Sequence, residues 1–253
     1  MHPDEAPAAP PPDAPEGAPR DVTRRRYEAL LRRSPVVSSL DEGAAAEMAR
    51  AATSRRFKKG ERIWRAGDRA THFQVVVSGI VKLVGNHAGL YPTLIDAFGP
   101  GESLGYWAAF DGSPYIGDAI PITPDVETLF VPAAVLVRIV ETRPGAALAM
   151  VHNVLAHSRA LRAKIAVLCA GTVGQRLAHL LLDLRDRFGD EAEDGSTLLP
   201  VPLSRHDLAL GVGATIETVI RTMSRWQKDG VLTTREGGFV LHDVGALEAL
   251  VTG

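Results

Sequence analysis

Residues 203–230 read LSRHDLALGVGATIETVIRTMSRWQKDG and predict two short helices on either side of a glycine-marked turn. Ser204 can cap the first helix, because Asp207 three residues later completes the pattern of a capping box. Gly211 and Gly213 allow the chain to turn tightly between the helices. This stretch therefore predicts a helix-turn-helix unit.

The second helix of this unit is expected over residues 215–228, and its two sides differ in character. Val219, Met223 and Trp226 recur at spacings of four and three residues and form one apolar stripe. The other side carries Thr215, Glu217, Arg221, Arg225 and Lys228. A buried stripe behind a polar, arginine-bearing front is what a DNA recognition helix requires.

This stretch closely resembles the DNA-binding end of the Crp/Fnr family of bacterial transcription regulators. The match runs without a gap from Leu203 to Leu232 and includes Glu217 and Arg221 as a Glu-x-x-x-Arg pair. The resemblance implies a sequence-specific transcription regulator and not an enzyme. It also implies a homodimer that binds a palindromic site in double-stranded DNA and works with RNA polymerase.

Two residues of the second helix are candidates for reading bases. Glu217 can accept a hydrogen bond from a cytosine amino group, and Arg221 can donate to guanine O6 and N7 or to a phosphate. Each good base contact gives about 1–3 kcal/mol of discrimination. The alternative, a solvated ion pair between the two side chains, is worth about 0.3–0.5 kcal/mol. Inside this motif we favour readout of one G·C pair.

Two isoleucines set the expected half-site apart from those of the family prototypes. Ile216 stands where cyclic-AMP-responsive members carry arginine, and Ile220 stands where oxygen-responsive members carry serine. Both side chains can contact thymine methyl groups. The candidates for phosphate contacts, each of which could equally be a cap or a surface residue, are Ser204, Arg205, His206 and Thr215.

The overall charge gives no support for DNA binding, because the net charge is −2. From residue 171 onward there are eight Lys and Arg residues and twelve Asp and Glu residues. Residues 215–228, by contrast, contain three basic residues and one acidic residue. A locally basic face is the relevant footprint, so we expect DNA binding to depend on this helix.

Residues 55–140 contain short β-segments separated by glycines, which indicates a β-sandwich or barrel. The order of the glycines resembles the cyclic-nucleotide-binding β-roll that precedes the DNA-binding domain in the Crp/Fnr family. An amphipathic helix is expected before it over residues 23–33, and a second helix over residues 41–53. We expect an α+β fold with an N-terminal antiparallel β-roll (jelly roll), a long dimerisation helix and a C-terminal winged helix-turn-helix.

The expected domains are a disordered Pro- and Ala-rich tail over residues 1–22, a sensor domain over 23–142, a dimerisation helix over 143–170 and a DNA-binding domain over 171–253. The wing is expected as a hairpin around residues 236–238. No run of about 18 uncharged apolar residues is present, and the N-terminal composition does not match a signal peptide. We therefore expect a cytoplasmic protein without membrane contact.

The long helix is expected to start at Pro144, a residue suited to the first helical position. After it, mainly apolar residues recur at alternating spacings of four and three, which is the pattern of a heptad seam. A buried core helix would give the same pattern, and the family resemblance favours dimerisation. The seam consists of Ala147, Val151, Val154, Ser158, Leu161, Ile165 and Leu168. Beyond a hinge at Gly171, Thr172 and Gln175 repeat the capping-box pattern and start a new helix.

The effector is where the sequence departs from the family. Cyclic-nucleotide binders in the family use a Gly-Glu pair for the ribose, an arginine for the phosphate and a Thr-Ser pair for adenine. Residues 111–121 contain no arginine, so a cyclic phosphate would lack its bidentate partner. The effector-pocket candidates are Gly101, Glu102, Tyr115, Leu161 and Arg162. We expect an unidentified small effector other than cyclic AMP; the alternative is a cyclic-nucleotide-, haem- or redox-responsive regulator.

The number and positions of the cysteines and histidines limit which cofactors the protein could bind. Cys169 is the only cysteine, which excludes an intrachain disulfide and an iron–sulfur cluster. A redox switch at Cys169 is the alternative to a small apolar residue at a packed joint. The haem ligands of the family's carbon-monoxide sensor would fall near Gly105 and Trp107, so that form of haem binding is absent. Haem binding through another histidine stays open, although no pattern supports it. The histidines in or beside the sensory region are His72, His87, His152 and His157. No metal-binding motif is expected.

Overall fold

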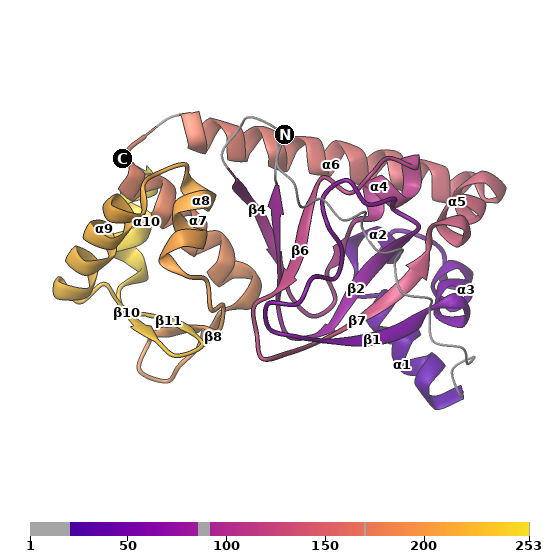
Figure 1. The fold of residues 1–253 in the computed structure, drawn as a ribbon, viewed down its shortest axis with the longest axis horizontal. Helices are drawn as coiled ribbons and strands as arrows, with labels where there is room; N and C mark the ends of the chain where they lie inside the picture. The colour runs from indigo at the N-terminus through magenta and orange to yellow at the C-terminus, as the bar shows by residue number, and fades with distance from the viewer. Residues whose placement is uncertain (1–20, 86–91, 170, 253) are drawn as a thin grey trace, which may run out of the picture.

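The computed structural model describes residues 21–85, 92–169 and 171–252. The expected tail lies outside these residues except for its last two positions, and His87 also lies outside them. Figure 1 shows a β-roll with its helices on one side, a smaller helical domain on the other, and the long helix α6 running past both. The α+β class and the order of β-roll, long helix and winged helix-turn-helix are confirmed.

Two antiparallel sheets form the β-roll. The first has the strand order β1-β7-β2-β5, and the second has the order β4-β3-β6. The strands are β1 (Thr53–Lys58), β2 (His72–Ser78), β3 (Val81–Gly85), β4 (Thr93–Phe98), β5 (Ser103–Leu104), β6 (Gly117–Pro121) and β7 (Asp125–Pro132). Because the side chains of a strand alternate between the two faces of a sheet, each strand has an inner and an outer set of residues.

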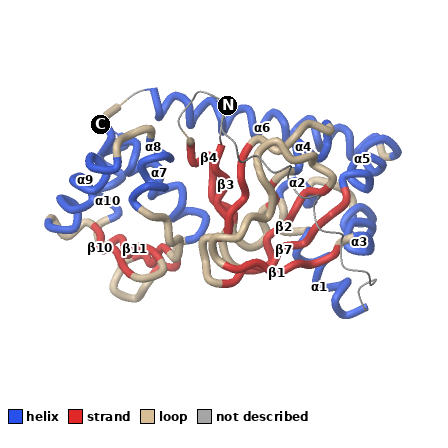
Figure 2. Tube along the Cα trace, in the orientation of Figure 1, coloured by secondary structure: helices blue, strands red, loops and turns tan. Residues whose placement is uncertain are grey.

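Short helices lie beside the first sheet, as Figure 2 shows; four of them pack on its strands, and the second packs on its neighbouring helices. They are α1 (Asp21–Leu31), α2 (Pro35–Ser38), α3 (Glu42–Ala51), α4 (Tyr106–Asp111) and α5 (Ala133–Thr142). Phe73 pairs with Val131 and Val75 with Leu129, and all four side chains are buried. Burial of a side chain of this size contributes about 1.5–3 kcal/mol. The helices near residues 23–33 and 41–53 were expected, whereas α2, α4 and α5 were not.

Helix α6 (Pro144–Cys169) starts at the expected proline and is 26 residues long. At about 1.5 Å per residue it extends for roughly 39 Å. Its first turns are held by Ala146, Ala149 and Met150, which are buried. Every residue from 154 to 166 is exposed, although the His157 ring lies beside the Trp107 ring and Lys164 Nζ donates to the Ile95 carbonyl oxygen of β4.

The C-terminal domain has the helix order expected from its caps. Thr172 and Gln175 form both hydrogen bonds of a capping box at the start of α7 (Val173–Phe188), and Ser204 and Asp207 do the same for α8. The remaining elements are α8 (Arg205–Val212), α9 (Ile216–Lys228), β10 (Leu232–Arg235), β11 (Gly238–Leu241) and α10 (Val244–Thr252). Strands β10 and β11 form the predicted wing, and β9 (Thr197–Leu199) with β8 (Asp190–Glu191) extends its sheet.

The two glycines of the helix-turn-helix have different roles, which corrects one expectation. Gly213 ends α8 in the left-handed region, with φ of 61°, and makes the turn. Gly211 lies inside α8 and is buried. A Cβ atom at Gly211 would lie 3.0 Å from Leu180 Cδ2 and 3.3 Å from Leu94 Cδ2. Gly211 therefore serves the close packing of α8 against α7 and the sensor strand β4, not the turn.

The C-terminal domain shares its hydrophobic core with the β-roll. The core around Leu177, Leu181 and Phe239 also includes residues of the second sheet of the roll. Those sensor residues are Ile80, Val84, Leu94, Ala97 and Ile122. The outer side of strands β3 and β4 is therefore covered by the C-terminal domain, which packs on the β-roll and is not attached through α6 alone.

Candidate DNA-binding surface and its link to the sensor

Helix α9 packs against the domain core through the apolar stripe that the sequence predicted. Val219, Met223 and Trp226 are buried, so one side of the helix faces the domain core. Thr215 is the N-cap, and its hydroxyl oxygen accepts a hydrogen bond from the Thr218 N–H at 3.3 Å. The helix therefore has a fixed start and a fixed rotation about its own axis.

The opposite side of α9 faces solvent. Glu217, Arg221 and Arg225 are exposed, and so are Ile216 and Ile220. The two isoleucines are 37% and 46% exposed. A pair of exposed isoleucines between charged residues fits a surface that is covered by a partner.

Glu217 and Arg221 do not form the ion pair that was the alternative interpretation of their spacing. Among the interactions of the residues that the structure describes, Arg221 has neither an ion pair nor a side-chain hydrogen bond. The backbone N–H of Glu217 and the hydroxyl of Thr215 lower the pKa of the Glu217 carboxyl. Glu217 is therefore ionised at neutral pH and can accept hydrogen bonds, while all five N–H donors of Arg221 remain available.

Ser204 and Asp207 hold the start of α8 together and connect it to the sensor. The Ser204 hydroxyl donates to Asp207 Oδ2 at 2.8 Å, and the Ser204 N–H donates to the same oxygen at 3.0 Å. The other carboxylate oxygen of Asp207 accepts a hydrogen bond from Lys82 Nζ of strand β3. Burial raises the pKa of Asp207, but the hydrogen bonds from Lys82 and Ser204 outweigh it and lower the pKa overall.

Arg205 and His206, both candidates for phosphate contacts, have different surroundings. Arg205 Nη2 donates to Thr234 Oγ1 of the wing at 2.5 Å, and its guanidinium carbon lies 5.7 Å from the centre of the Phe239 ring. Burial lowers the pKa of Arg205. His206 is exposed. Arg205 therefore joins α8 to the wing, whereas His206 is accessible to a ligand.

The seam residues of α6 form an exposed apolar face. Of the ten large hydrophobic side chains that are exposed in the described chain, six lie on α6. Val151, Val154, Leu161 and Ile165 of the seam are between 47% and 53% exposed. Ser158 is exposed among them, whereas Leu168 is half-buried.

The effector-pocket candidates occupy three separate places. Gly101 and Glu102 lie in the turn between β4 and β5, where Glu102 Oε2 accepts a hydrogen bond from the Gly99 N–H at 2.8 Å. Tyr115 is buried in the roll, stacks on Trp64 with ring centres 4.2 Å apart and donates its hydroxyl to the His72 carbonyl oxygen.

Leu161 and Arg162, the remaining candidates, are exposed on α6. Burial raises the pKa of Tyr115 to about 12, so its hydroxyl stays protonated. Tyr115 and the Trp64 ring fill part of the interior of the roll. The five candidates are thus not brought together by direct contacts.

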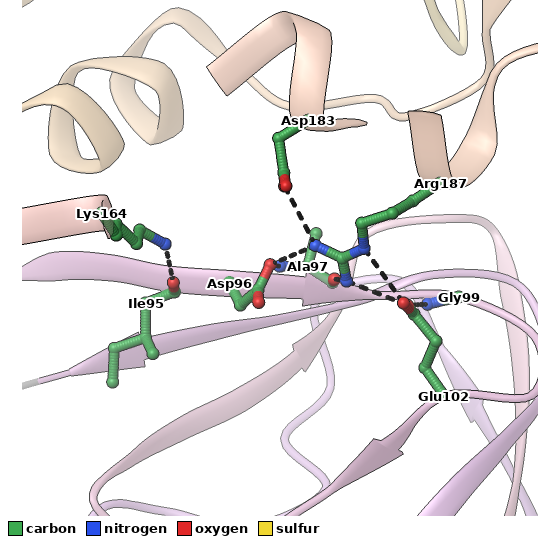
Figure 3. A network of polar contacts seen from close by, with 8 residues as sticks. All are labelled: Ile95, Asp96, Ala97, Gly99, Glu102, Lys164, Asp183 and Arg187. Atoms are coloured by element: carbon green, nitrogen blue, oxygen red, sulfur yellow. Dashed lines mark hydrogen bonds and ion pairs between the residues drawn. The ribbon is translucent and has the colours of Figure 1, made fainter. Parts of the chain in front are cut away.

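Glu102 belongs to an interdomain network around Arg187, which the sequence did not predict (Figure 3). Arg187 lies on α7 and donates to Glu102 through Nε at 3.0 Å and through Nη2 at 3.0 Å. The same guanidinium donates to Asp96 Oδ1 at 2.7 Å and to the Ala97 carbonyl oxygen at 2.5 Å. Burial lowers the pKa of Arg187, but the charges of Asp96 and Glu102 raise it overall.

Cys169 and the histidines have no shared site in the described part of the chain. Cys169 is exposed at the end of α6. His72 is in β2, where burial lowers its pKa, and the His157 ring lies 5.5 Å from the Trp107 ring. Within the described ranges, no three His, Cys, Asp or Glu side chains are grouped to hold a metal ion. In the same ranges, no helix has both the length and the apolar character to cross a membrane.

Two family models match separate parts of the chain. The cyclic nucleotide-binding domain matches residues 54–143, and the Crp-like helix-turn-helix domain matches residues 175–250. Together they cover well over half of the 253 residues. The first match contains the β-roll, and the second contains α8, α9 and the wing.

Related proteins match over most of their length. The nitrogen fixation regulation protein FixK of Bradyrhizobium diazoefficiens is 26% identical, with 88% of this chain and 92% of that protein aligned. The CRP-like cAMP-activated global transcriptional regulator of Mycobacterium tuberculosis is 24% identical, with 85% and 95% aligned.

Solved structures show the same fold. The structure of FixK2 from Bradyrhizobium japonicum aligns with a TM-score of 0.67 at 23% identity and covers 79% of this chain and 96% of that one. The two family models and the full-length relatives agree with the recognition helix, the wing and the β-roll described above. The chain therefore belongs to the Crp/Fnr family of DNA-binding transcription regulators.

Proposed function

We propose that this protein regulates transcription, without enzymatic activity, by reading a palindromic DNA site through Glu217 and Arg221. The observation that carries the proposal is the front of α9, where an ionised carboxylate and an unengaged guanidinium stand one turn apart above a buried stripe. Ile220 lies between them and is placed to contact a thymine methyl group. Thr215, Ser204 and His206 would contact the phosphates that flank the base pair.

The second element of the proposal is a homodimer formed through α6. The exposed face with Val151, Val154, Leu161 and Ile165 has the heptad spacing of a two-stranded coiled coil. A second copy of the chain would cover this face. The two-fold axis would then place the recognition helices in successive major grooves, about 34 Å apart. RNA polymerase would be the partner of the DNA-bound dimer.

The third element is an effector other than cyclic AMP. Three observations support it: residues 111–121 carry no arginine for a cyclic phosphate, Tyr115 stacks on Trp64 inside the roll, and Glu102 is engaged by Arg187. A ribose would have to displace the guanidinium to reach Glu102. Titration calorimetry with cyclic AMP should therefore release no heat, and micromolar binding would refute this element.

DNA reading is tested by gel shift on palindromic duplexes selected from a random pool. Wild-type protein should enrich one sequence. In Glu217→Ala and Arg221→Ala, the binding free energy that distinguishes one G·C pair from other base pairs should fall by about 1–3 kcal/mol. Arg225→Ala is the matched control, because it removes an equal charge from the exposed side of the same helix. The control should weaken binding to all sequences alike. Unchanged base preference in Arg221→Ala would refute the readout.

A further inference from the structure

Among the contacts between the DNA-binding domain and its own sensor domain, one arginine makes several hydrogen bonds at once. Arg187 projects from the last turn of α7 and meets three acceptor groups of the sensor, which are the Asp96 carboxylate, the Glu102 carboxylate and the Ala97 carbonyl oxygen (Figure 3). Asp183, one turn earlier on α7, lies 3.3 Å from the guanidinium on the other side. The five N–H donors of an arginine are needed to serve so many acceptors in one plane.

We propose that Arg187 is a positioning residue for DNA recognition: it holds the DNA-binding domain in the orientation that fixes the spacing between the two half-sites. The proposal rests on the function proposed above. A dimer through α6 sets the position of the two sensor domains, and the docking of each DNA-binding domain on its sensor then sets the direction of α9. Half-site spacing is therefore a property of this interface and not of α9 itself.

The contacts around Arg187 make the docked orientation specific. The Phe188 ring packs on Gly99 of the sensor so closely that a Cβ atom at Gly99 would lie 2.5 Å from Phe188 Cε1. The Arg187 guanidinium carbon lies 4.9 Å from the centre of the same ring. Lys82 of β3, the cross-strand neighbour of Ala97, pairs with Asp207 of α8. The polar contacts of α7 and α8 and the apolar contact of Phe188 together restrict rotation of the domain on the β-roll.

The docked orientation leaves the DNA-reading residues free. Glu217, Ile220 and Arg221 are exposed, and none of their side-chain interactions within the described chain involves the sensor. His206 and Thr215, candidates for phosphate contacts, are exposed too. The docked state thus leaves the DNA-reading side of α9 accessible, and a domain that is already oriented binds with a smaller loss of conformational entropy.

The test is a set of palindromes that share one half-site sequence and differ only in the number of base pairs between the half-sites. Full-length wild-type dimer should bind one spacing best. Arg187→Gln should reduce the discrimination between the best spacing and its neighbours on the order of tenfold, a typical size for coupling between two parts of a protein. The preference for the G·C pair within each half-site should remain, because α9 is unchanged.

Two matched controls separate positioning from a general loss of charge on α7. Arg185→Gln removes an arginine two residues away that bonds only Asp186 and Glu248, within the DNA-binding domain. Asp183→Asn removes a carboxylate that touches Arg187 from its own helix. Both controls should keep the wild-type spacing preference. Arg187→Lys should restore part of it, since a lysine provides the charge but not the planar set of donors.

The outcomes are distinct. Unchanged spacing preference in Arg187→Gln would overturn the proposal, and so would tighter binding at every spacing, because the docked state would then oppose DNA binding. Failure of the wild type to bind any palindrome would instead refute the proposed function. If Arg187→Gln does not fold, the double variant Asp96→Asn/Glu102→Gln tests the same contact from the sensor side and must show the same loss.

Discussion

Two arginines of the DNA-binding domain, Arg221 and Arg187, differ in what their guanidinium groups are used for. Arg221 has Glu217 one turn before it, yet the two do not pair and both side chains are exposed. The Arg187 side chain is 23% exposed and bonds Asp96 and Glu102 of the sensor. A satisfied guanidinium holds the molecule together, whereas an unsatisfied one on a rigid helix is available to a ligand. The difference is one of tertiary environment, since both residues belong to similar amphipathic helices.

The largest expected effect on stability comes from removing the guanidinium group of Arg187, in comparison with removing that of Arg221. Arg187→Ala should lower the free energy of unfolding by about 2–3 kcal/mol, because Asp96 and Glu102 would remain close together and partly buried without their cation. Arg221→Ala should change stability by less than about 0.5 kcal/mol, as expected for an exposed residue without partners. Urea unfolding followed by circular dichroism measures both. Equal effects of the two substitutions would remove the distinction.

Arg205 provides a smaller test, because it was a candidate for a phosphate contact and the structure places it against the wing. Arg205→Met should reduce stability by about 0.5–1.5 kcal/mol through loss of the Thr234 hydrogen bond and the contact with Phe239. The dependence of DNA affinity on salt should not change. A residue that bonds a phosphate would reduce the slope of log K against log salt by about 1 when it is removed. Such a reduction would show that Arg205 contacts a DNA phosphate.

The smallest effect concerns pH and the Lys82–Asp207 pair. The pKa of Asp207 in the folded protein lies below its ordinary value of 3.8. A lowered carboxyl pKa adds stability above the ordinary value, and this stability is lost as the pH falls through the folded value. The difference in free energy of unfolding between wild type and Asp207→Asn should therefore be smaller at about pH 3 than at about pH 6. Urea unfolding at the two pH values measures it.

Glu217→Gln is the control for that experiment. The pKa of Glu217 is also lowered, but the side chain is fully exposed and makes no contact with the sensor. Because solvent screens the interactions of this exposed carboxylate, its substitution should change stability much less than Asp207→Asn does. A constant difference for Asp207→Asn across the range would mean that the pair with Lys82 does not contribute to docking.

Local signals account for the elements that were predicted correctly. The capping boxes at Thr172 and Ser204 and the proline at position 144 mark helix starts because they satisfy or remove backbone N–H groups within a few residues. The stripe on α9 predicted which side is buried, because a helix has the same period wherever it packs. Helices α4 and α5 were missed because their short sequences lack side-chain caps.

The effector candidates depend on contacts that short sequence patterns do not specify. Gly101 and Glu102 match a short family pattern, but the pattern does not specify which side chain the carboxylate meets. In the structure Glu102 meets Arg187, which lies 85 residues later in the chain. Tyr115 meets Trp64, 51 residues before it. Contacts at such distances in sequence depend on how the sheets and helices stack, which short patterns do not encode.

The sequence by itself determined that α9 is an amphipathic recognition helix with Glu217 and Arg221 on its free side, and that α6 carries a heptad seam. Both follow from periodicity along a single helix. Only the tertiary structure decided that the DNA-binding domain docks on strands β3 and β4, that Arg187 serves both domains, and that Gly211 is a packing residue. These depend on the close approach of surfaces far apart in the chain, where complementary shape and charge select one arrangement.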